Sequence, residues 1–218
     1  DHQDVMACRQ TGCAMLAAGS VQEVADLAPV AHLAAIKGRL PFINFFDGFR
    51  TSHEVQKIEL LEYRDYGELL DKDMVRAFKK RALSPNKPCF RGTAQNSDIY
   101  FQGREASNPF YDDIIPIVEE YMNKIGKQTG RTYHLFDYYG DPNAEYVVVA
   151  MGSVTEAIEQ TIDYYNKQGE KYGLIKVHLY RPFSVEHLLE AIPKTVKKIA
   201  VLDRTKEPGA VGEPLYVD

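Results

Sequence analysis

The sequence predicts an α/β fold made of two parallel-sheet, Rossmann-like blocks joined by a partly helical connector. Three observations support this prediction. Residues 1–58 contain a strand–helix–strand pattern, and residues 133–218 contain three strand patterns that alternate with helices. Residues 59–132, between these blocks, contain two helical patterns separated by polar sequence. We therefore expect three parts, with boundaries near residues 58 and 132.

The first block is predicted to be a βαβ unit. The small apolar run 13–18 indicates a short buried strand. Ser20 and Glu23 match the S-x-x-E capping box, in which a hydroxyl and a carboxylate accept hydrogen bonds at a helix start, so a helix is expected over 21–36. The apolar run 41–46 is typical of a strand covered on both faces. A unit this short favours parallel strands with a right-handed crossover.

Two residues should shape the helix over 21–36. Pro29 lies inside it and should kink it or end its first section, because proline donates no backbone hydrogen bond. Gly38 lies between Lys37 and Arg39 and should close the helix, since glycine favours helix ends and basic side chains complement the helix dipole.

The connector, residues 59–132, is predicted to contain two helices that pack on the neighbouring blocks. The first is a surface helix over 71–83, which ends at the proline-rich run 84–88. The second is an amphipathic helix over 112–127, with Pro116 inside it and Gly130 at its end. The stretch between them is polar and shows little periodicity, so we assign no regular element to it.

The second block is predicted to form a parallel sheet. Strands are expected at 146–151, 173–179 and 198–203, with helices over 155–168 and 184–192 between them. The turn after the first of these strands lacks the G-x-G-x-x-G pattern, so a dinucleotide-binding fingerprint is absent.

Composition excludes several classes of partner. The 218 residues include 26 Lys+Arg and 31 Asp+Glu, a net charge of −5 with no basic run, which argues against nucleic acid. No apolar stretch approaches the roughly 18 residues of a membrane span, so we expect no membrane partner. Cys8, Cys13 and Cys89 are widely spaced and form no C-x-x-C, which favours reduced thiols in a cytoplasmic protein and no metal held by this chain. Both ends look cut, so a larger parent protein is expected.

Ligands of parallel α/β sheets lie beyond the carboxyl ends of the strands, which draws attention to the loop after residues 41–46. In this loop, Arg50 could bind a carboxylate or phosphate with two hydrogen bonds, and His53 could transfer protons near neutral pH. Asp47 and Thr51 lie in the same loop. The simpler alternative is a structural turn in which Arg50 pairs with Asp47 or Glu54.

Three further segments are weaker candidates. The run 203–209 follows the last predicted strand and carries four charged groups, but an ion-paired surface turn explains it equally well. Arg104 and Glu105 could be an adjacent ion pair at a domain contact. Residues 181–183 are most simply the end of a strand and the start of a helix. The sequence contains no G-x-S-x-G, P-loop or H-E-x-x-H motif, and no G-D-G…N signature for thiamine diphosphate and magnesium.

Several longer strings resemble the pyruvate:ferredoxin (flavodoxin) oxidoreductase family. The similarity runs over essentially all 218 residues, and strings this long and unusual make it specific. They are residues 1–6 (DHQDVM), 45–54 (FFDGFRTSHE), 92–96 (GTAQN), 98–106 (DIYFQGREA) and 201–210 (VLDRTKEPGA). The resemblance implies that residues 1–58 are the later part of the pyrimidine-side thiamine-binding domain. It also implies that residues 133–218 are a truncated domain similar to the C-terminal domain of transketolase.

The resemblance further implies a large cytoplasmic enzyme of anaerobic metabolism, usually a homodimer, that converts pyruvate and coenzyme A into acetyl-CoA and CO2. Its cofactors would be thiamine diphosphate, Mg2+ and [4Fe–4S] clusters, and its electron carrier would be ferredoxin or flavodoxin. This chain would be an internal piece that contacts the remaining domains of the same polypeptide. A related enzyme that acts on another 2-oxoacid, or a purely structural or dimerisation module, are the alternatives.

The same resemblance places the catalytic residues outside this chain. The residues that bind pyruvate and the aminopyrimidine ring would precede Asp1, and the diphosphate–magnesium site, cluster cysteines and main coenzyme A contacts would follow Asp218. No catalytic residue or metal ligand is therefore assigned, and the chain alone is expected to bind none of the cofactors. The remaining candidates would neighbour substrate or cofactor, or contact other domains: Asp47, Arg50, Thr51, His53, Arg104 and Glu105. Sheet edges left open by missing strands should need a cover.

Overall fold

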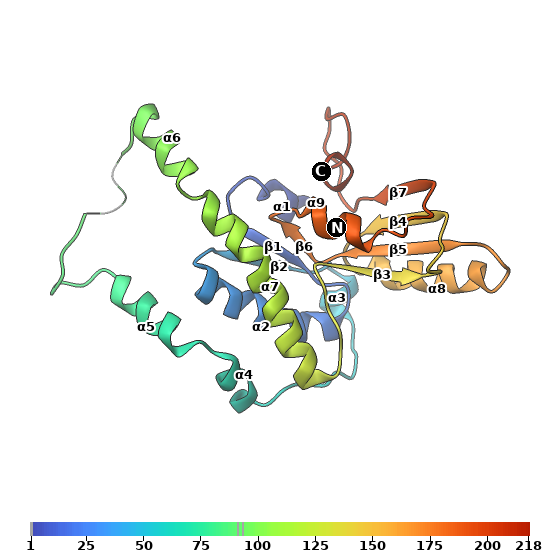
Figure 1. Cartoon of the computed structure of the whole chain (residues 1–218), viewed down its shortest axis with the longest axis horizontal. Coiled ribbons are helices and arrows are strands. Elements are labelled where there is room, and N and C mark those ends of the chain that lie inside the picture. The colour runs from blue at the N-terminus through green and yellow to red at the C-terminus, as the bar shows by residue number, and fades with distance from the viewer. Residues whose placement is uncertain (1, 91, 93) are drawn as a thin grey trace.

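The computed structural model describes residues 2–90, 92 and 94–218, and helices alternate with strands along most of the chain (Figure 1). The strands are β1 (Ala14–Ala17), β2 (Phe42–Phe45), β3 (Phe136–Gly140), β4 (Tyr146–Ala150), β5 (Tyr172–Val177), β6 (Leu179–Arg181) and β7 (Lys198–Leu202). The helices are α1 (Gln3–Ala7), α2 (Val21–Gly38), α3 (Arg50–His53), α4 (Tyr63–Leu69), α5 (Lys72–Arg81), α6 (Ser97–Glu105), α7 (Asn108–Thr129), α8 (Val154–Asn166), α9 (Val185–Ala191) and α10 (Pro214–Val217).

The first sheet has the strand order β2-β1-β6. β1 and β2 are parallel, which confirms the pairing predicted for the βαβ unit. β6 comes from the second predicted block and pairs antiparallel with β1, so hydrogen bonds join the two blocks. The sequence pattern predicts one strand over 173–179, whereas the structure has two strands there, β5 and β6. The chain instead breaks at His178, whose backbone N–H donates to Leu135 O, and enters the first sheet.

The second sheet has the order β3-β5-β4-β7. β4 is parallel to both β5 and β7, which confirms the three predicted parallel strands. β3 pairs antiparallel with β5 and was not predicted. The sheet is therefore mixed, with the antiparallel strand at one edge, an arrangement that is common in large α/β sheets.

The structure corrects two expectations for α2. The helix continues through Pro29, so proline does not end a first section. Gly38 is the last helical residue, and Arg39 adopts the left-handed conformation (φ 62°) that closes the helix. Glycine is needed at position 38 for a different reason, because a Cβ there would overlap Cδ1 of Ile114 on α7. The predicted start is confirmed, since Ser20 Oγ accepts a hydrogen bond from Glu23 N at 3.1 Å.

β2 is less covered than its apolar sequence predicted. Only Phe45 is buried, and the other three residues of the strand are half-buried. β2 is also an edge strand, because within the described residues it pairs with β1 alone. An unpaired edge exposes backbone N–H and C=O groups that another strand can bind. The open edge of β2 agrees with the expectation that a sheet edge in this chain needs to be covered by another segment.

The connector contains α5 and α7 where two helices were predicted, and it adds α4 and α6. Gly130 ends α7 in the left-handed conformation (φ 75°), as predicted. α7 packs along α2, and its inward face is fully buried. No residue of α4, α5 or α6 is buried, and Figure 1 shows these three helices away from both sheets.

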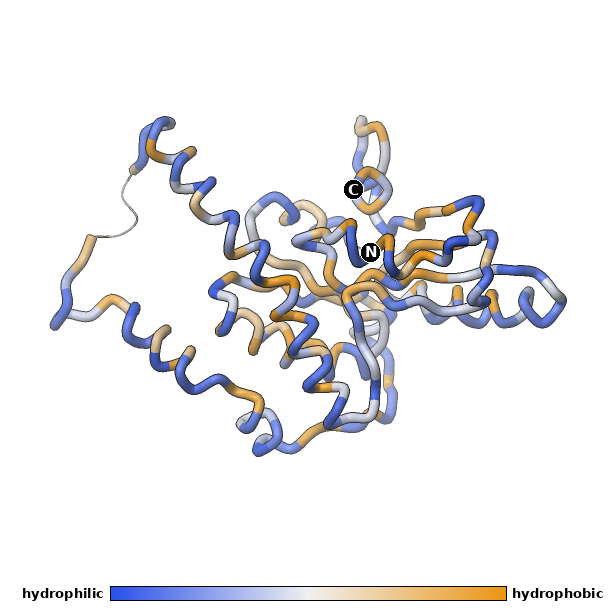
Figure 2. The backbone as a smooth tube through the Cα atoms, in the orientation of Figure 1, coloured by the Kyte–Doolittle hydropathy of each residue, from blue (hydrophilic) through white to orange (hydrophobic). Residues whose placement is uncertain are grey.

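The core lies where α2 packs against the first sheet and α7 packs along α2, and it continues into the second sheet. Figure 2 shows hydrophobic residues concentrated along the strands of both sheets, whereas α5 and α6 carry many hydrophilic residues. In the parts of the chain that the structure describes, no helix has the length and apolar character needed to cross a membrane.

Candidate functional site

Three strands end close together between the two sheets, at the edge where parallel α/β sheets bind ligands. Asp47 follows β2, Ser153 follows β4 and Arg204 follows β7. The side chains of these residues meet that of His2, which comes from the start of the chain. We call these four residues the junction cluster, because they connect the first sheet to the second.

Short polar contacts join the four residues of the junction cluster, although His2 Nδ1 is buried without a hydrogen-bond partner in the described part of the chain. His2 Nε2 lies 2.8 Å from Asp47 Oδ1. The backbone N–H of Ser153 donates to Asp47 Oδ2, and Arg204 Nη1 lies 3.4 Å from the same oxygen. Arg204 Nη1 also donates to Ser153 Oγ at 2.9 Å. Asp47 is 0% exposed and His2 is 1% exposed, so water does not reach the pair.

The surroundings of Asp47 keep its carboxylate ionised. Burial by itself would raise the pKa of Asp47, but the hydrogen bonds from His2 and Ser153 outweigh burial and hold the pKa well below its ordinary value of 3.8. Gly152 makes room for this arrangement, since it has φ 81° and a Cβ there would lie 2.7 Å from Asp47 Oδ2. A buried carboxylate with these contacts to His2, Ser153 and Arg204 can hold three strand ends together but is not accessible to a substrate in this state.

The structure separates the four candidates in the loop after β2. Asp47 is in the junction cluster, and its basic neighbours are His2 and Arg204. Among the described residues, Arg50 forms no ion pair with Asp47 or Glu54, so the predicted alternative pairing is wrong. Arg50 is exposed instead. Thr51 is 5% exposed, and its Oγ1 has no hydrogen-bond partner in the described part of the chain.

His53 lies on the outer side of the same loop, where a ligand or another domain can reach it. The Nδ1 atom of His53 is 2.8 Å from Ser52 Oγ, and its ring stacks on Phe49 with 4.9 Å between ring centroids. Phe49 is 81% exposed and has φ 66°, a conformation that costs energy for a residue with a side chain. The loop therefore presents two stacked rings to its surroundings on a strained backbone.

The run 203–209 is mainly the ion-paired turn that was one of its two predicted explanations. Asp203 accepts hydrogen bonds from the backbone N–H groups of Leu215 and Tyr216, at 3.0 and 3.1 Å, and so caps α10. Lys206 pairs with Glu213 at 2.5 Å. Arg204 is the exception, because its guanidinium reaches inward to the junction cluster.

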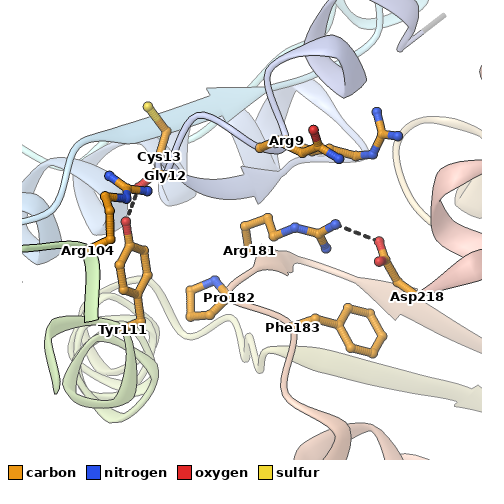
Figure 3. A pocket seen from close by; sticks show the side chains of 10 residues that line it. Arg9, Gly12, Cys13, Arg104, Tyr111, Arg181, Pro182, Phe183 and Asp218 are labelled. Carbon is orange, nitrogen blue, oxygen red and sulfur yellow. Dashed lines mark hydrogen bonds and ion pairs between the residues drawn. The ribbon is translucent and has the colours of Figure 1, made fainter. Parts of the chain in front are cut away.

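Arg104 lies elsewhere, in a cavity of about 420 Å³ that is open to solvent (Figure 3). Arg9 and Arg181 line the same cavity, together with Asp218. Figure 3 shows Arg104 on one side, Asp218 on the other and Arg181 between them. We call this cavity the arginine cavity. Sequence analysis does not identify Arg9 as a candidate site residue, and it predicts only that Arg181 lies at the end of a strand.

Glu105 does not line the arginine cavity. It is exposed, and its carboxylate accepts a hydrogen bond from Asn108 Nδ2 at 3.2 Å. No ion pair joins Glu105 to Arg104 within the described ranges, so the predicted adjacent pair is wrong. The six candidates thus fall into two regions, with four in the loop after β2 and two at the end of α6.

A second buried polar cluster connects the sheets and was missed by sequence reasoning. His178 is 2% exposed, with Nε2 3.1 Å from Asp137 Oδ2 and Nδ1 3.0 Å from Ala17 O. Burial opposes protonation of His178, but Asp137 and Glu23 outweigh it and raise its pKa to about 9. Nearby, Lys176 pairs with Glu159. The contacts of His178 join β3 to the end of β1, and the Lys176 pair joins β5 to α8. No local sequence pattern indicates these contacts.

The described residues do not fit an iron–sulfur cluster or a metal ion, two of the cofactors that the family resemblance implies. A [4Fe–4S] cluster is held by four thiolates, and this sequence has three cysteines. Cys8 and Cys13 are half-buried and Cys89 is exposed. In the described part of the chain, no group of three or more His, Cys, Asp or Glu side chains is placed to hold a metal ion.

Comparison with known proteins shows matches along the whole chain. A family model described as "Pyruvate flavodoxin/ferredoxin oxidoreductase, thiamine diP-bdg" matches residues 1–123, and one described as "Pyruvate:ferredoxin oxidoreductase core domain II" matches residues 144–218. The first match extends past the predicted boundary at residue 58 and includes most of the predicted connector. The division at residues 58 and 132 stays a prediction.

Two curated relatives show how strong the similarity is. The chain is 64% identical to pyruvate-flavodoxin oxidoreductase from Enterobacter agglomerans and 63% identical to pyruvate:ferredoxin oxidoreductase from Moorella thermoacetica. Both alignments cover 100% of this chain and 19% of the relative, so the chain spans about a fifth of their length. Among solved structures, 2-oxoglutarate:ferredoxin oxidoreductase from Magnetococcus marinus is similar in fold, with a TM-score of 0.52 and 15% identity. That match covers 91% of this chain and 37% of the other.

Proposed function

The chain belongs to the pyruvate flavodoxin/ferredoxin oxidoreductase family, and we propose that it is part of an enzyme that oxidatively decarboxylates pyruvate. In this proposal, pyruvate and coenzyme A give acetyl-CoA and CO2. The electrons pass through [4Fe–4S] clusters to ferredoxin or flavodoxin. The observation that carries the proposal is the identity of 64% over the full chain to a relative named for this reaction.

We propose that other parts of the larger enzyme hold the cofactors. When bound, thiamine diphosphate supplies the electron sink that decarboxylation of a 2-oxoacid needs. The cysteine count and the absence of a metal-binding cluster among the described residues support this assignment. The isolated chain should then neither bind thiamine diphosphate tightly nor reduce an electron carrier. Pyruvate-dependent reduction of a dye by the purified 218-residue chain would contradict this expectation.

Within the enzyme, the residues of this chain act as a scaffold that fixes the ends of the strands. Asp47 stays ionised and holds His2, Ser153 and Arg204 at the junction of the two sheets. The exposed rings of Phe49 and His53, just beyond the junction, then have a fixed position from which they contact a neighbouring domain. The open edge of β2 is a second surface that the remaining domains can cover.

A chimeric enzyme tests the proposed activity directly. This chain would replace the matching segment of the Moorella thermoacetica relative, to which all 218 residues of the chain align. We expect the purified chimera to reduce ferredoxin when both pyruvate and coenzyme A are present, at a rate comparable to that of the unmodified relative. The proposal is wrong if a folded, cofactor-loaded chimera does not reduce ferredoxin with pyruvate, since the chimera differs from the relative only in this segment.

We also propose that the parent enzyme is a cytoplasmic homodimer. Three free cysteines support a reducing compartment, because disulfides are rare in the cytosol. Light scattering of the parent enzyme, eluted from a sizing column, should give twice the mass of one chain. A monomer with full activity would exclude the homodimer and leave the proposed reaction intact.

A further inference from the structure

The arginine cavity brings together three arginines from separate parts of the chain. Arg9 follows α1, Arg104 lies in the last turn of α6 and Arg181 is the last residue of β6. The cavity volume of about 420 Å³ falls within the range of roughly 300–1,000 Å³ that small-molecule sites occupy. Tertiary structure therefore creates a concave basic surface that no run of the sequence contains.

The wall of this cavity carries a positive charge in a chain that is negative overall. Three arginines line it against one carboxylate, Asp218, a net charge of +2, whereas the whole chain has −5. Arg181 Nη2 pairs with Asp218 at 2.8 Å, and Arg9 pairs with Glu207, which lies off the wall, at 2.7 Å. Arg104 forms no ion pair with any residue that the structure describes. The guanidinium of Arg104 is thus the group available to an anion.

Backbone geometry places Arg104 close to the cavity wall. Gly12 has φ 90°, and a Cβ there would lie 2.8 Å from Tyr111 Oη and 3.6 Å from Arg104 Nη2. The hydroxyl of Tyr111 donates to Gly12 O at 2.9 Å and connects α7 to this wall. Phe183 lines the cavity on another side, where Figure 3 shows its ring near Asp218. The cavity thus combines a basic side with an aromatic one.

We propose that the arginine cavity binds a small organic oxyanion, a phosphate or a carboxylate, through Arg104. Guanidinium groups bind both oxyanions with paired N–H···O hydrogen bonds, which are stronger than neutral ones. Arg9 and Arg181 add positive potential at the sides, and the aromatic wall accommodates the apolar part of the ligand. This binding does not depend on the proposed reaction, because it needs only residues that line the cavity.

Calorimetric titration of the chimera, loaded with thiamine diphosphate, tests the site. The probes are inorganic pyrophosphate, which carries phosphate groups, and succinate, which carries carboxylates. We expect one bound probe per chain, and Arg104→Gln should weaken that binding about tenfold or more, since a charged hydrogen bond is lost. Arg64→Gln is the matched control, because Arg64 is an 83% exposed arginine on α4, outside the cavity, and should leave the affinity unchanged. Binding of pyrophosphate alone would assign a phosphate ligand, and binding of succinate alone a carboxylate.

Three outcomes would overturn the proposal. The first is that neither probe binds. The second is that the Arg104→Gln variant binds the probe as tightly as the parent does. The third is that Arg64→Gln weakens probe binding as much as Arg104→Gln does. The last result would mean that diffuse surface charge attracts the probe. Because both substituted arginines are exposed, circular dichroism should show that both variants fold. Activity of the chimera with pyruvate is measured in parallel, so a failure of the anion site is distinguished from a failure of the proposed reaction.

Discussion

Replacing Asp47 with asparagine tests whether the junction cluster holds the two sheets together. The change keeps the size of the side chain but removes the charge of a carboxylate that is 0% exposed. Loss of one partner from a buried ion pair costs about 3–5 kcal/mol, because the other charge is left without compensation. The side chain of Arg204 is 27% exposed and can be hydrated, so the lower end of that range applies. We expect Asp47→Asn to lower the free energy of unfolding by about 3 kcal/mol at neutral pH.

The pH dependence gives the same prediction an independent check. The pKa of Asp47 in the folded chain lies below its ordinary value of 3.8, so ionisation favours the folded state. This contribution is complete above pH 3.8 and is lost as the pH falls below it towards the folded pKa. Asp47→Asn lacks the titrating group. The stability difference between parent and variant should therefore be largest near neutral pH and should shrink in acid.

Urea unfolding of the 218-residue chain, followed by circular dichroism, measures both effects. Asp73→Asn is the control, since Asp73 lies on α5, is 79% exposed and pairs with Arg76 at the surface. Its loss should cost no more than about 1 kcal/mol. If Asp47→Asn is no less stable than this control, or if the difference from the parent stays constant into acid, the cluster does not stabilise the junction and the reasoning fails.

Two further substitutions test neighbouring parts of the junction. Gly152→Ala should lower the melting temperature more than Gly169→Ala, because both glycines have positive φ but only at Gly152 would a Cβ approach Asp47 Oδ2, at 2.7 Å. Equal shifts in thermal melts would rule out crowding at the cluster. His178→Gln should flatten the pH dependence of stability between pH 6.5 and 9. Burial opposes protonation of His178 but Asp137 outweighs it, so its stabilising charge is complete below 6.5 and lost as the pH rises through 9. Urea midpoints that change equally with pH in parent and variant would contradict this assignment.

Elements with local signals were predictable from the sequence. The capping residues of α2, the glycine that ends α7 and the apolar runs of β1, β2 and β4 all depend on residues close together in the chain. β6 depends instead on pairing with β1, more than 160 positions earlier, and its three residues carry no strand pattern of their own. β3 was missed for the same reason, since its partner β5 supplies the hydrogen bonds that define it.

The candidate site could be predicted only in part, because its residues lie far apart along the chain. The rule that ligands lie beyond strand ends selected Asp47 and the run that contains Arg204. It could not pair them, because 157 positions separate the two residues. Arg50 is a nearer basic residue and was the natural partner to expect, yet its position at the start of α3 leaves it exposed. The arginine cavity has the same origin, since Arg9, Arg104 and Arg181 meet only after folding.

The two regions differ in what their charges can do. The folded state becomes less stable if the buried carboxylate of Asp47 loses any of its three polar partners. Substrate binding at Asp47 would therefore have to compensate for breaking the junction. An exposed guanidinium with no ionic partner among the described residues has no such cost, and binding an anion only replaces water. Charged side chains therefore have two roles in this chain: Asp47 stabilises the junction of the two sheets, and Arg104 is available to bind a ligand. The choice between these roles follows from burial and pairing, which the sequence alone does not give.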